Sequence, residues 1–264
     1  MIKILVCGAG GKMGREVIKA VTADVALSMV GGVDIMAAGQ DAGELAGLGH
    51  LDIPVYGDLK AGIAAVTPDV VVDFTSPKVI FENAKIILGE GVHLVIGTTG
   101  LTDEQREMLS ESAKTHHANV LVAPNFSLGA VMMMKISAEI APYLPNVEII
   151  ELHHNKKYDA PSGTAIRTAL LISEARKGVV PAEDKTKESL VGARGAKVND
   201  IPIHSVRLPG YVAHQEVLFG GVGEILTIRH DSLSRESFMP GVIIACKKIA
   251  AHPGLTYGLE HYLD

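Results

Sequence analysis

Residues 2–14 read IKILVCGAGGKMG, a short apolar run followed directly by a segment that contains four glycines. The apolar run has the length and composition of a buried strand, and the residues from about 12 to 23 continue with helical periodicity. Glycines placed between a strand and a helix let backbone N–H groups approach a pyrophosphate at the positive end of the helix. The spacing of Gly8, Gly11 and Gly14 therefore predicts a turn that binds a dinucleotide.

Asp34 is the second part of this predicted site. It ends a second apolar run, ALSMVGGVD, at the usual distance of about 20 residues, where a carboxylate can accept hydrogen bonds from ribose hydroxyls. The next residue is Ile35, and not an arginine that could pair with a 2′-phosphate. The pair therefore favours NADH over NADPH, although a lysine elsewhere could reverse that preference. The alternative is a plain tight turn beside a surface aspartate.

Three further apolar runs are each followed by a helical stretch: PDVVVDFT, VHLVIGTT and ANVLVAPN. Strands that are apolar nearly throughout and alternate with helices predict an α/β fold, a Rossmann-like doubly wound parallel sheet. Ligands of such folds bind outside the carboxyl ends of the strands. We therefore expect the loops GTTG (97–100) and APNFS (123–127) to face the nicotinamide. The loop DFTSP (73–77) has a similar place, but ordinary loop chemistry explains it equally well.

The pattern changes near the prolines at 142 and 145. A strand and a helix come first, and the polar stretch at 177–200 after them is expected to be a mobile loop. Three β-rich runs follow with no helix between them, which predicts antiparallel pairing. The last helical run, at about 236–251, matches the helices of the first half. We predict a dinucleotide-binding domain of residues 1–126 plus 235–264, and an inserted α+β domain of residues 127–234.

The bulk composition excludes several classes of partner. The 264 residues carry a formal net charge of −6, which argues against nucleic acid or an anionic membrane surface, because both require a basic face. No apolar run of the sequence is long enough to span a bilayer. The two cysteines form no disulfide framework. We expect a cytoplasmic protein without nucleic-acid or membrane partners.

The stretch ELHHNKKYDAPSGTA, residues 151–165, crowds proton donors and cations against a tight turn. Neighbouring side chains of an extended segment point in opposite directions, so His153 and His154 should have different roles. Lys157 adds a flexible cation that can bind a carboxylate or donate a proton. The backbone N–H groups of Gly163 and Thr164, near a helix start, are expected to bind an anion. The segment is suited to a small carboxylate-bearing molecule that must be protonated.

A structural role and a metal site are the alternatives to catalysis for this segment. A single histidine at a strand end is more often structural or solvated than catalytic. A metal site would need further ligands, but no cysteine or carboxylate joins the pair at zinc spacing, and Glu151 is only two residues away on a strand. We therefore expect no metal, and the combination of two histidines, a lysine and an anion-binding turn favours catalysis.

This stretch resembles the signature of the 4-hydroxy-tetrahydrodipicolinate reductase (dihydrodipicolinate reductase) family. GAGGKMG, DAGELAG, DFTSP, GTTG and APNFS resemble further motifs of that family, in the same order over most of the chain. The resemblance implies NAD(P)H-dependent reduction of 4-hydroxy-tetrahydrodipicolinate to tetrahydrodipicolinate with loss of water, in diaminopimelate and lysine biosynthesis. It also implies a Rossmann-like domain with an inserted domain, here residues 127–234, for substrate binding and tetramerisation, and a homotetramer that binds a small dicarboxylate.

The resemblance also implies roles for individual residues. His153 would be the proton donor and acceptor and Lys157 a second proton donor, while His154, Gly163 and Thr164 would bind the substrate carboxylates. The cofactor would be bound by Gly8, Ala9, Gly10, Gly11, Lys12, Met13, Asp34, Gly97, Thr98, Thr99, Ala123, Pro124, Asn125 and Phe126. Ile35 departs from the family members that carry arginine there. The alternatives are another NAD-dependent dehydrogenase of an aspartate-derived substrate and a non-catalytic NAD(H)-binding sensor.

Overall fold

The computed structural model describes residues 1–263 and consists of two compact units. The first unit comprises Met1–Phe126 and the segment that returns at Phe238; the second unit is Ser127–Ser237. The predicted return was at residue 235, three residues earlier than in the structure.

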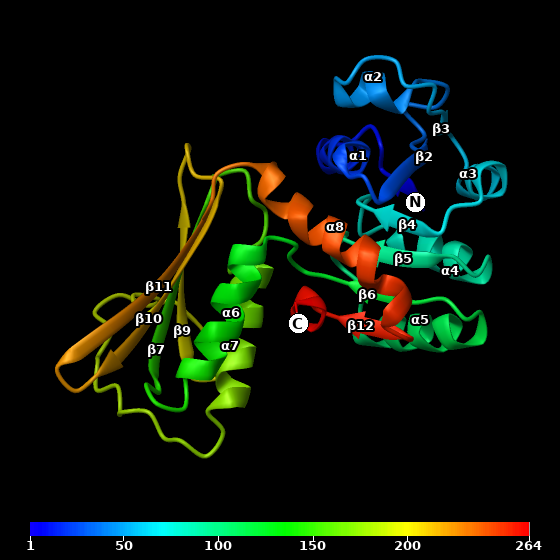
Figure 1. The fold of residues 1–264 in the computed structure, drawn as a ribbon. Helices are drawn as coiled ribbons and strands as arrows, with labels where there is room; N and C mark the ends of the chain where they lie inside the picture. Colours follow the sequence, from blue (N-terminus) through cyan, green and yellow to red (C-terminus); the bar gives the residue numbers. More distant parts are fainter. Residues whose placement is uncertain (264) are drawn as a thin grey trace. The chain divides into compact units, whose positions relative to one another are not determined.

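The first unit contains a seven-stranded parallel sheet in the order β12-β6-β5-β4-β1-β2-β3 (Figure 1). Its strands are β1 (Ile2–Cys7), β2 (Leu27–Val33), β3 (Val55–Tyr56), β4 (Val70–Asp73), β5 (His93–Ile96), β6 (Val120–Val122) and β12 (Leu255–Tyr257). Consecutive residues of the central strands, such as Ile4 and Leu5, are both 0% exposed. Both faces of the sheet are therefore covered, which confirms the predicted doubly wound α/β class.

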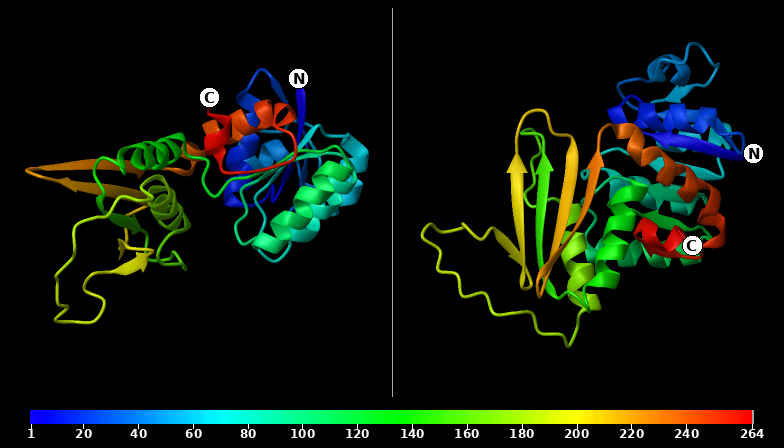
Figure 2. Two further views of the ribbon diagram at one scale, coloured as in Figure 1. Left: turned by 90° about the horizontal axis from the view of Figure 1, so that it is seen from below. Right: turned by 60° about the vertical axis from the view of Figure 1, so that its left-hand side comes forward.

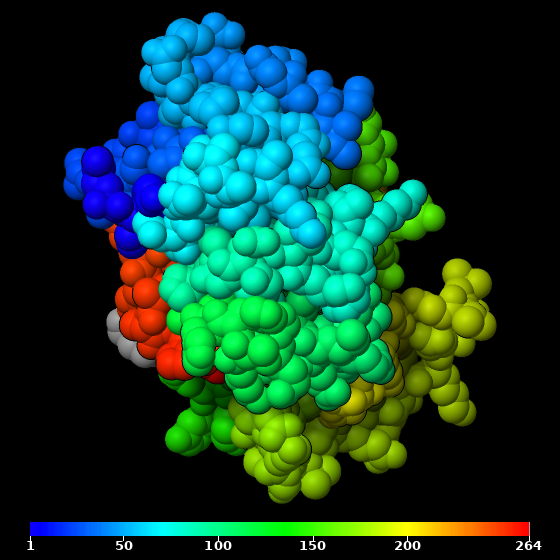
Figure 3. All heavy atoms as spheres, turned by 90° about the vertical axis from the view of Figure 1, so that its right-hand side faces the viewer, coloured from blue at the N-terminus to red at the C-terminus, as the bar shows by residue number. Residues whose placement is uncertain are grey.

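Helices cover the two faces of this sheet in two groups. They are α1 (Lys12–Ala23), α2 (Ala42–Ala46), α3 (Leu59–Val66), α4 (Ile80–Gly89), α5 (Asp103–Thr115) and α8 (Met239–Lys248). Helices α1 and α8 lie on one face of the sheet, and α3, α4 and α5 lie on the other (Figure 1). The latter three form the continuous surface, cyan to green, in Figure 3.

The helix ends follow local signals. Thr102 and Gln105 form a capping box at the start of α5, with the Gln105 N–H donating to the Thr102 hydroxyl at 3.2 Å. The last helix is shorter than the predicted 236–251, since 3₁₀ turns at Arg235–Phe238 and Ile249–Ala251 flank α8. Pro240 explains its start, because proline is tolerated only in the first turn of an α-helix.

The second unit contains a five-stranded mixed sheet in the order β11-β10-β7-β9-β8. Its strands are β7 (Asn146–His153), β8 (Ala196–Val198), β9 (Ile201–Arg207), β10 (Ala213–Gly221) and β11 (Glu224–Ser232). Helices α6 (Leu128–Ile140) and α7 (Gly163–Ala175) pack together against one face (Figures 1 and 2). The opposite face carries no helix of the described chain and is called the open face below.

The predicted pairing of the three consecutive β-rich runs is partly wrong. Strands β10 and β11 are antiparallel neighbours as expected, but β9 does not pair with β10. Strand β7 lies between them and pairs in parallel with β9. A parallel pair needs a long crossover connection, and here α7 with the following long loop provides it. The sequence between the runs carries no signal for this insertion.

The stretch predicted as a loop at 177–200 is mostly irregular but contains the short strand β8. Its Ala182 N–H donates to Asn146 Oδ1 at 2.7 Å, which attaches the segment to the start of β7. Across residues 1–263, every helix is too short or too polar to cross a lipid bilayer.

Candidate functional site

The glycine turn after β1 depends on missing Cβ atoms. Gly8 has φ +79°, and a Cβ there would lie 2.5 Å from the Phe74 carbonyl oxygen. A Cβ on Gly14 would lie 2.0 Å from the carbonyl oxygen of Gly8, so only glycine lets α1 start this close to the strand. Gly11 is the N-cap of α1, and Lys12 and Met13 form its first turn. The turn and the helix start have the geometry that suits a pyrophosphate.

Asp34 is joined to this turn. Its Oδ2 accepts a hydrogen bond from the Gly10 N–H at 3.0 Å, and its Oδ1 accepts from the Met36 N–H at 2.9 Å. The predicted ribose ligand and the predicted pyrophosphate turn are therefore in direct contact. Ile35 beside it is 81% exposed.

A second carboxylate, that of Asp73 at the end of β4, ties two loops together. It is 0% exposed, and its Oδ1 accepts from the Thr75 N–H at 3.0 Å and the Thr98 hydroxyl at 2.7 Å. Asn83 donates to its Oδ2 at 3.0 Å. This role was not predicted from the sequence, although the charged residue that closes the run VVVD was a signal for it.

The structure brings the predicted loops after β5 and β6 together. Thr98, Thr99, Ala123 and Pro124 line one small cavity of about 70 Å³. Gly97, before them, has no room for a side chain, since a Cβ would lie 2.0 Å from the Phe74 ring. That ring packs against buried Phe126, with ring centroids 5.7 Å apart.

All the predicted cofactor residues thus lie at the carboxyl ends of parallel strands. Strand β1 pairs with both β2 and β4, so the strand order reverses beside the glycine turn. Open α/β sheets bind their ligands at this kind of switch point. The residues present fit a dinucleotide.

The second group of predicted residues lies at the end of β7 in the second unit. Glu151 and His153 point to the same face of the sheet, and His153 Nδ1 lies 2.5 Å from Glu151 Oε2. His154 follows the strand, and its Nδ1 accepts from the Lys156 N–H at 3.2 Å. The two adjacent imidazoles therefore have different partners, in line with the alternation of an extended segment.

Lys157 lies in the turn that follows. Its N–H donates to the His154 carbonyl at 3.1 Å, and its Nζ lies 2.7 Å from Asp159 Oδ1. Burial raises the pKa of Asp159, but the hydrogen bond and charge of Lys157, a backbone hydrogen bond and the charge of Arg207 together lower it by more, so that the pKa is lowered. The lysine side chain is 22% exposed, and Asp159 holds its ammonium group.

The Pro-Ser-Gly-Thr turn forms the start of α7. Ser162 is the N-cap, and its hydroxyl accepts from the Ala165 N–H at 3.2 Å. Gly163 and Thr164 begin the helix. A Cβ added at Gly163 would have no described atom within 4 Å, so there is room beside this helix start.

Two residues of this group were not predicted from the sequence. Glu151 was considered only as a metal ligand and rejected, and Arg207 was not considered. Glu151 is 0% exposed and accepts two hydrogen bonds from the guanidinium of Arg207, at 2.8 and 2.7 Å. Burial raises the pKa of Glu151, but hydrogen bonds from His153, Arg207 and Ser205 outweigh it and lower the pKa to about 2. The alternation of Val147, Ile149 and Glu151 on the buried face was a signal for a buried carboxylate.

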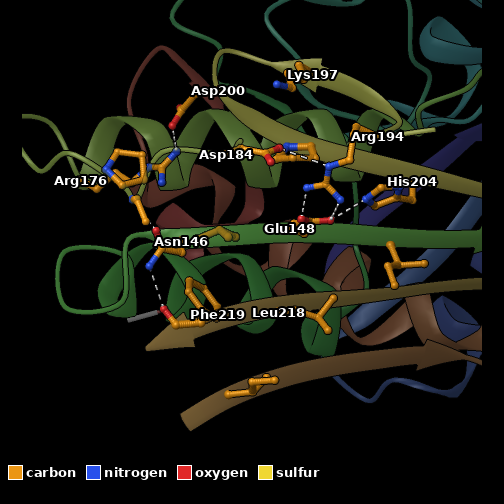
Figure 4. A pocket seen from close by; sticks show the side chains of 17 residues that line it. Asn146, Glu148, Arg176, Asp184, Arg194, Lys197, Asp200, His204, Leu218 and Phe219 are labelled. Carbon is orange, nitrogen blue, oxygen red and sulfur yellow. Dashed lines mark hydrogen bonds and ion pairs between the residues drawn. The ribbon is translucent and has the colours of Figure 1, made fainter. Parts of the chain in front are cut away.

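A larger cavity, of about 870 Å³, lies on the open face of the same sheet (Figure 4). Glu148, Arg194 and His204 contribute to its lining, and Figure 4 shows the Glu148 carboxylate between the other two side chains. It is separate from the His153 group, because residues 148 and 151 lie on opposite faces of the strand. Within the described chain, residues 1–263, no three His, Cys, Asp or Glu side chains are grouped to hold a metal ion.

Comparison with known proteins gives consistent matches over the whole chain. Residues 2–126 match the family model of the N-terminus of dihydrodipicolinate reductase, and residues 129–263 match that of its C-terminus. The 4-hydroxy-tetrahydrodipicolinate reductase of Syntrophomonas wolfei is 48% identical over 99% of this chain and 98% of its own. That of Listeria welshimeri is 49% identical over 100% of both chains.

A solved structure supports the same relationship. The dipicolinate-bound dihydrodipicolinate reductase from Paenisporosarcina sp. TG-14 has a TM-score of 0.84 to this chain. It is 43% identical and covers 99% of both chains. The match therefore includes both units and the order in which the chain builds them.

Proposed function

The chain belongs to the dihydrodipicolinate reductase family, and from this premise we propose how its residues carry the reaction. It is an NAD(P)H-dependent oxidoreductase that reduces 4-hydroxy-tetrahydrodipicolinate to tetrahydrodipicolinate with loss of water, a step of diaminopimelate and lysine biosynthesis. Its ligand is a small dicarboxylate, as dipicolinate is for the Paenisporosarcina relative. The relatives favour this activity over another aspartate-derived substrate and over an NAD(H) sensor.

We propose that the first unit binds the cofactor along its strand ends. The turn from Gly8 to Met13 would hold the pyrophosphate, and Asp34 the ribose of the adenosine half. The loop residues Gly97, Thr98, Thr99, Ala123, Pro124, Asn125 and Phe126 would contact the nicotinamide half. When bound, the reduced nicotinamide supplies the hydride.

His153 is the proposed proton donor. Reduction of a conjugated cyclic imine leaves electron density on the ring, which a proton must quench at the neighbouring carbon. The observation that carries this assignment is the 2.5 Å contact between His153 Nδ1 and the buried Glu151 carboxylate. It fixes one ring nitrogen and leaves the other, Nε2, for proton transfer.

Lys157, His154 and the start of α7 are the proposed partners of the substrate. Lys157 would assist the loss of water or stabilise charge that develops on the ring. His154, with the backbone N–H groups of Gly163 and Thr164, would bind the carboxylates, because a helix N-terminus favours negative charge. The open space beside Gly163 supports this assignment.

The test of these roles is turnover with enzymatically generated substrate, followed as NADH oxidation. His153→Gln should lose most of kcat, by about 100-fold or more if general acid catalysis is removed. NADH affinity, measured by titration of its fluorescence, should be unchanged. Lys157→Ala should behave similarly. Full turnover by His153→Gln would contradict the proposed role.

We also propose that NADH is preferred over NADPH. Asp34 is held by the glycine turn, and its carboxylate would repel a 2′-phosphate. Lys12 and Arg15 are the nearby cations that could oppose this preference, since Arg15 Nε donates to the Gly10 carbonyl at 3.0 Å. Comparing kcat/KM for the two nicotinamides tests the proposal, and a higher value with NADPH would contradict it.

A homotetramer is the proposed assembly. Strand β11 forms one edge of the mixed sheet and exposes Ile225 by 78% and Leu226 by 39%, and an apolar edge strand is suited to association. Light scattering should give four times the chain mass of 27.9 kDa, and Ile225→Lys should reduce it. A monomer would contradict the proposal.

We propose a cytoplasmic location, which the two buried free cysteines support, because disulfides are rare in reducing compartments. Fractionation of cells should find the enzyme in the cytoplasmic fraction.

A further inference from the structure

We propose that Glu151 is a positioning residue for the reaction, which holds the His153 ring in one orientation and one tautomer, and that Arg207 locks Glu151 in place. This inference rests on the proposed role of His153 as the proton donor. The buried ion pair between Glu151 and Arg207 would then serve the reaction and not only the stability of the fold.

The first support is that the acceptors of Glu151 are all in use. Oε1 accepts from the Ser162 N–H at 3.1 Å and from Arg207 Nη2 at 2.7 Å. Oε2 accepts from His153 Nδ1 at 2.5 Å and from Arg207 Nη1 at 2.8 Å. The carboxylate is therefore fixed from three segments: the strand, the start of α7 and the neighbouring strand β9. A side chain held in this way cannot turn away from the imidazole.

The second support is the direction of the hydrogen bond to His153. The hydrogen bonds to Glu151 lower its pKa to about 2, so the group is ionised near neutrality and can only accept. Nδ1 of His153 must therefore carry a proton. In the neutral ring Nε2 is then the basic nitrogen, and in the charged ring Nε2 carries the proton that can be donated. One ring atom alone changes its protonation state.

The third support is that Arg207 also reaches the turn that carries Lys157. Its Nη2 donates to the Asp159 carbonyl at 2.8 Å, and Asp159 holds the Lys157 ammonium at 2.7 Å. In the sheet, Arg207 lies directly opposite His153. One guanidinium therefore fixes the positions of both proposed proton donors.

Stability alone does not account for this arrangement. Replacing a buried ion pair by apolar side chains is often neutral or stabilising, so the pair is weak evidence for a structural purpose. The neighbours Val147 and Ile149, on the same face of the strand, are apolar and buried. The single charged residue of that row lies beside the proposed proton donor.

Glu151→Gln tests the proposal by reversing the hydrogen bond between residue 151 and His153. The amide oxygen, at the Oε1 position, would still accept from Arg207 Nη2 and the Ser162 N–H. The amide NH₂, at the Oε2 position, would lose the bond from Arg207 Nη1 and would donate to Nδ1. The proton of the neutral ring would then move to Nε2. We expect kcat to fall about 100-fold or more, as for loss of a general acid, with NADH affinity unchanged. A kcat within 3-fold of the wild type would overturn the proposal.

The matched control is Glu148→Gln. Glu148 is on the same strand and has the same types of partner, Arg194 and His204, but on the open face (Figure 4). It should keep the wild-type kcat, with assembly checked by light scattering. A loss equal to that of Glu151→Gln would mean that any charge removed from β7 has this effect, and would overturn the proposal.

A double variant separates positioning from a general structural effect. In a His153→Gln background, Glu151→Gln should lower kcat by less than about 3-fold further, because it acts through the missing imidazole. Two multiplied losses would overturn the positioning role while leaving the role of His153 intact. If His153→Gln alone keeps full turnover, the proposed function itself has failed, and that single variant shows it.

The wild-type protein provides a test that needs no folded Glu151 variant. With ¹⁵N-labelled histidine, the ring signals of His153, assigned by their absence in His153→Gln, should show the Nδ1–H tautomer in the neutral ring. An Nε2–H tautomer would overturn the proposal.

Discussion

Replacing Asp73 with alanine should loosen the loops that we assign to the nicotinamide half of the cofactor. The buried carboxylate accepts four hydrogen bonds: two from Thr75, at 3.0 and 2.7 Å, one from Thr98 at 2.7 Å and one from Asn83 at 3.0 Å. Each such bond contributes about 1 kcal/mol net, and a buried donor left unpaired costs roughly 1–3 kcal/mol. The two hydroxyls can rotate to other acceptors. We therefore expect the first unit to lose about 3–4 kcal/mol of unfolding free energy.

The assay is urea unfolding combined with an NADH titration of the folded protein. Asp73→Asn is the conservative variant, since its amide oxygen can keep the Oδ1 contacts and Asn83 can turn its own oxygen toward the new NH₂; it should lose about 1 kcal/mol. Asp58→Ala is the control, because exposed Asp58 only caps α3 and should cost about 1 kcal/mol. NADH affinity should fall for Asp73→Ala alone. Equal losses for Asp73→Ala and Asp58→Ala, or unchanged NADH affinity, would refute the reasoning.

Three further predictions concern the glycine turn and the Glu151 group. Gly14→Ala should abolish NADH binding in calorimetry, because its Cβ would lie 2.0 Å from the Gly8 carbonyl oxygen, whereas Gly89→Ala, with open space around it, should bind normally. The pKa of Glu151 is lowered from 4.5 to about 2, so the ionised carboxylate stabilises the folded state fully above pH 4.5, and this stabilisation is lost as the pH falls toward 2. Urea titrations should therefore show that the difference in unfolding free energy between the wild type and Glu151→Gln shrinks across that range. Arg207→Lys keeps the charge but not the two parallel hydrogen bonds, so kcat should fall about 10-fold, with the KM for NADH unchanged in steady-state assays.

Several elements have the bounds predicted from sequence, because their signals are local. Strand β1 and helix α1 coincide with the predicted ranges. The apolar run before the glycines and the helical periodicity after them identify both without any long-range information. Thr102 and Gln105 likewise identify the start of α5 from a spacing of three residues.

Elements defined by distant partners were not predictable in this way. Strand β12 is three residues long and pairs with β6 far away in the sequence, so it has no local pattern of its own. The place of β9 beside β7 depends on a crossover through α7 and not on the run itself. Arg207 could not be joined to Glu151 from sequence, because 56 residues separate them and only the register of two parallel strands brings them together.

Asp73 and Glu151 show the same physical device in the two units. Each is a 0% exposed carboxylate near the carboxyl end of a strand, where the backbone ladder stops and loop N–H groups need other acceptors. A carboxylate can accept from several directions, so one side chain can hold donors from two or three segments that diverge from the strand end. Burial of a charge is costly, and such a residue persists only where those donors are all in place. An acidic residue that interrupts a buried row near the end of a strand therefore indicates segments held at fixed positions, and here those segments carry the proposed cofactor and proton-donor residues.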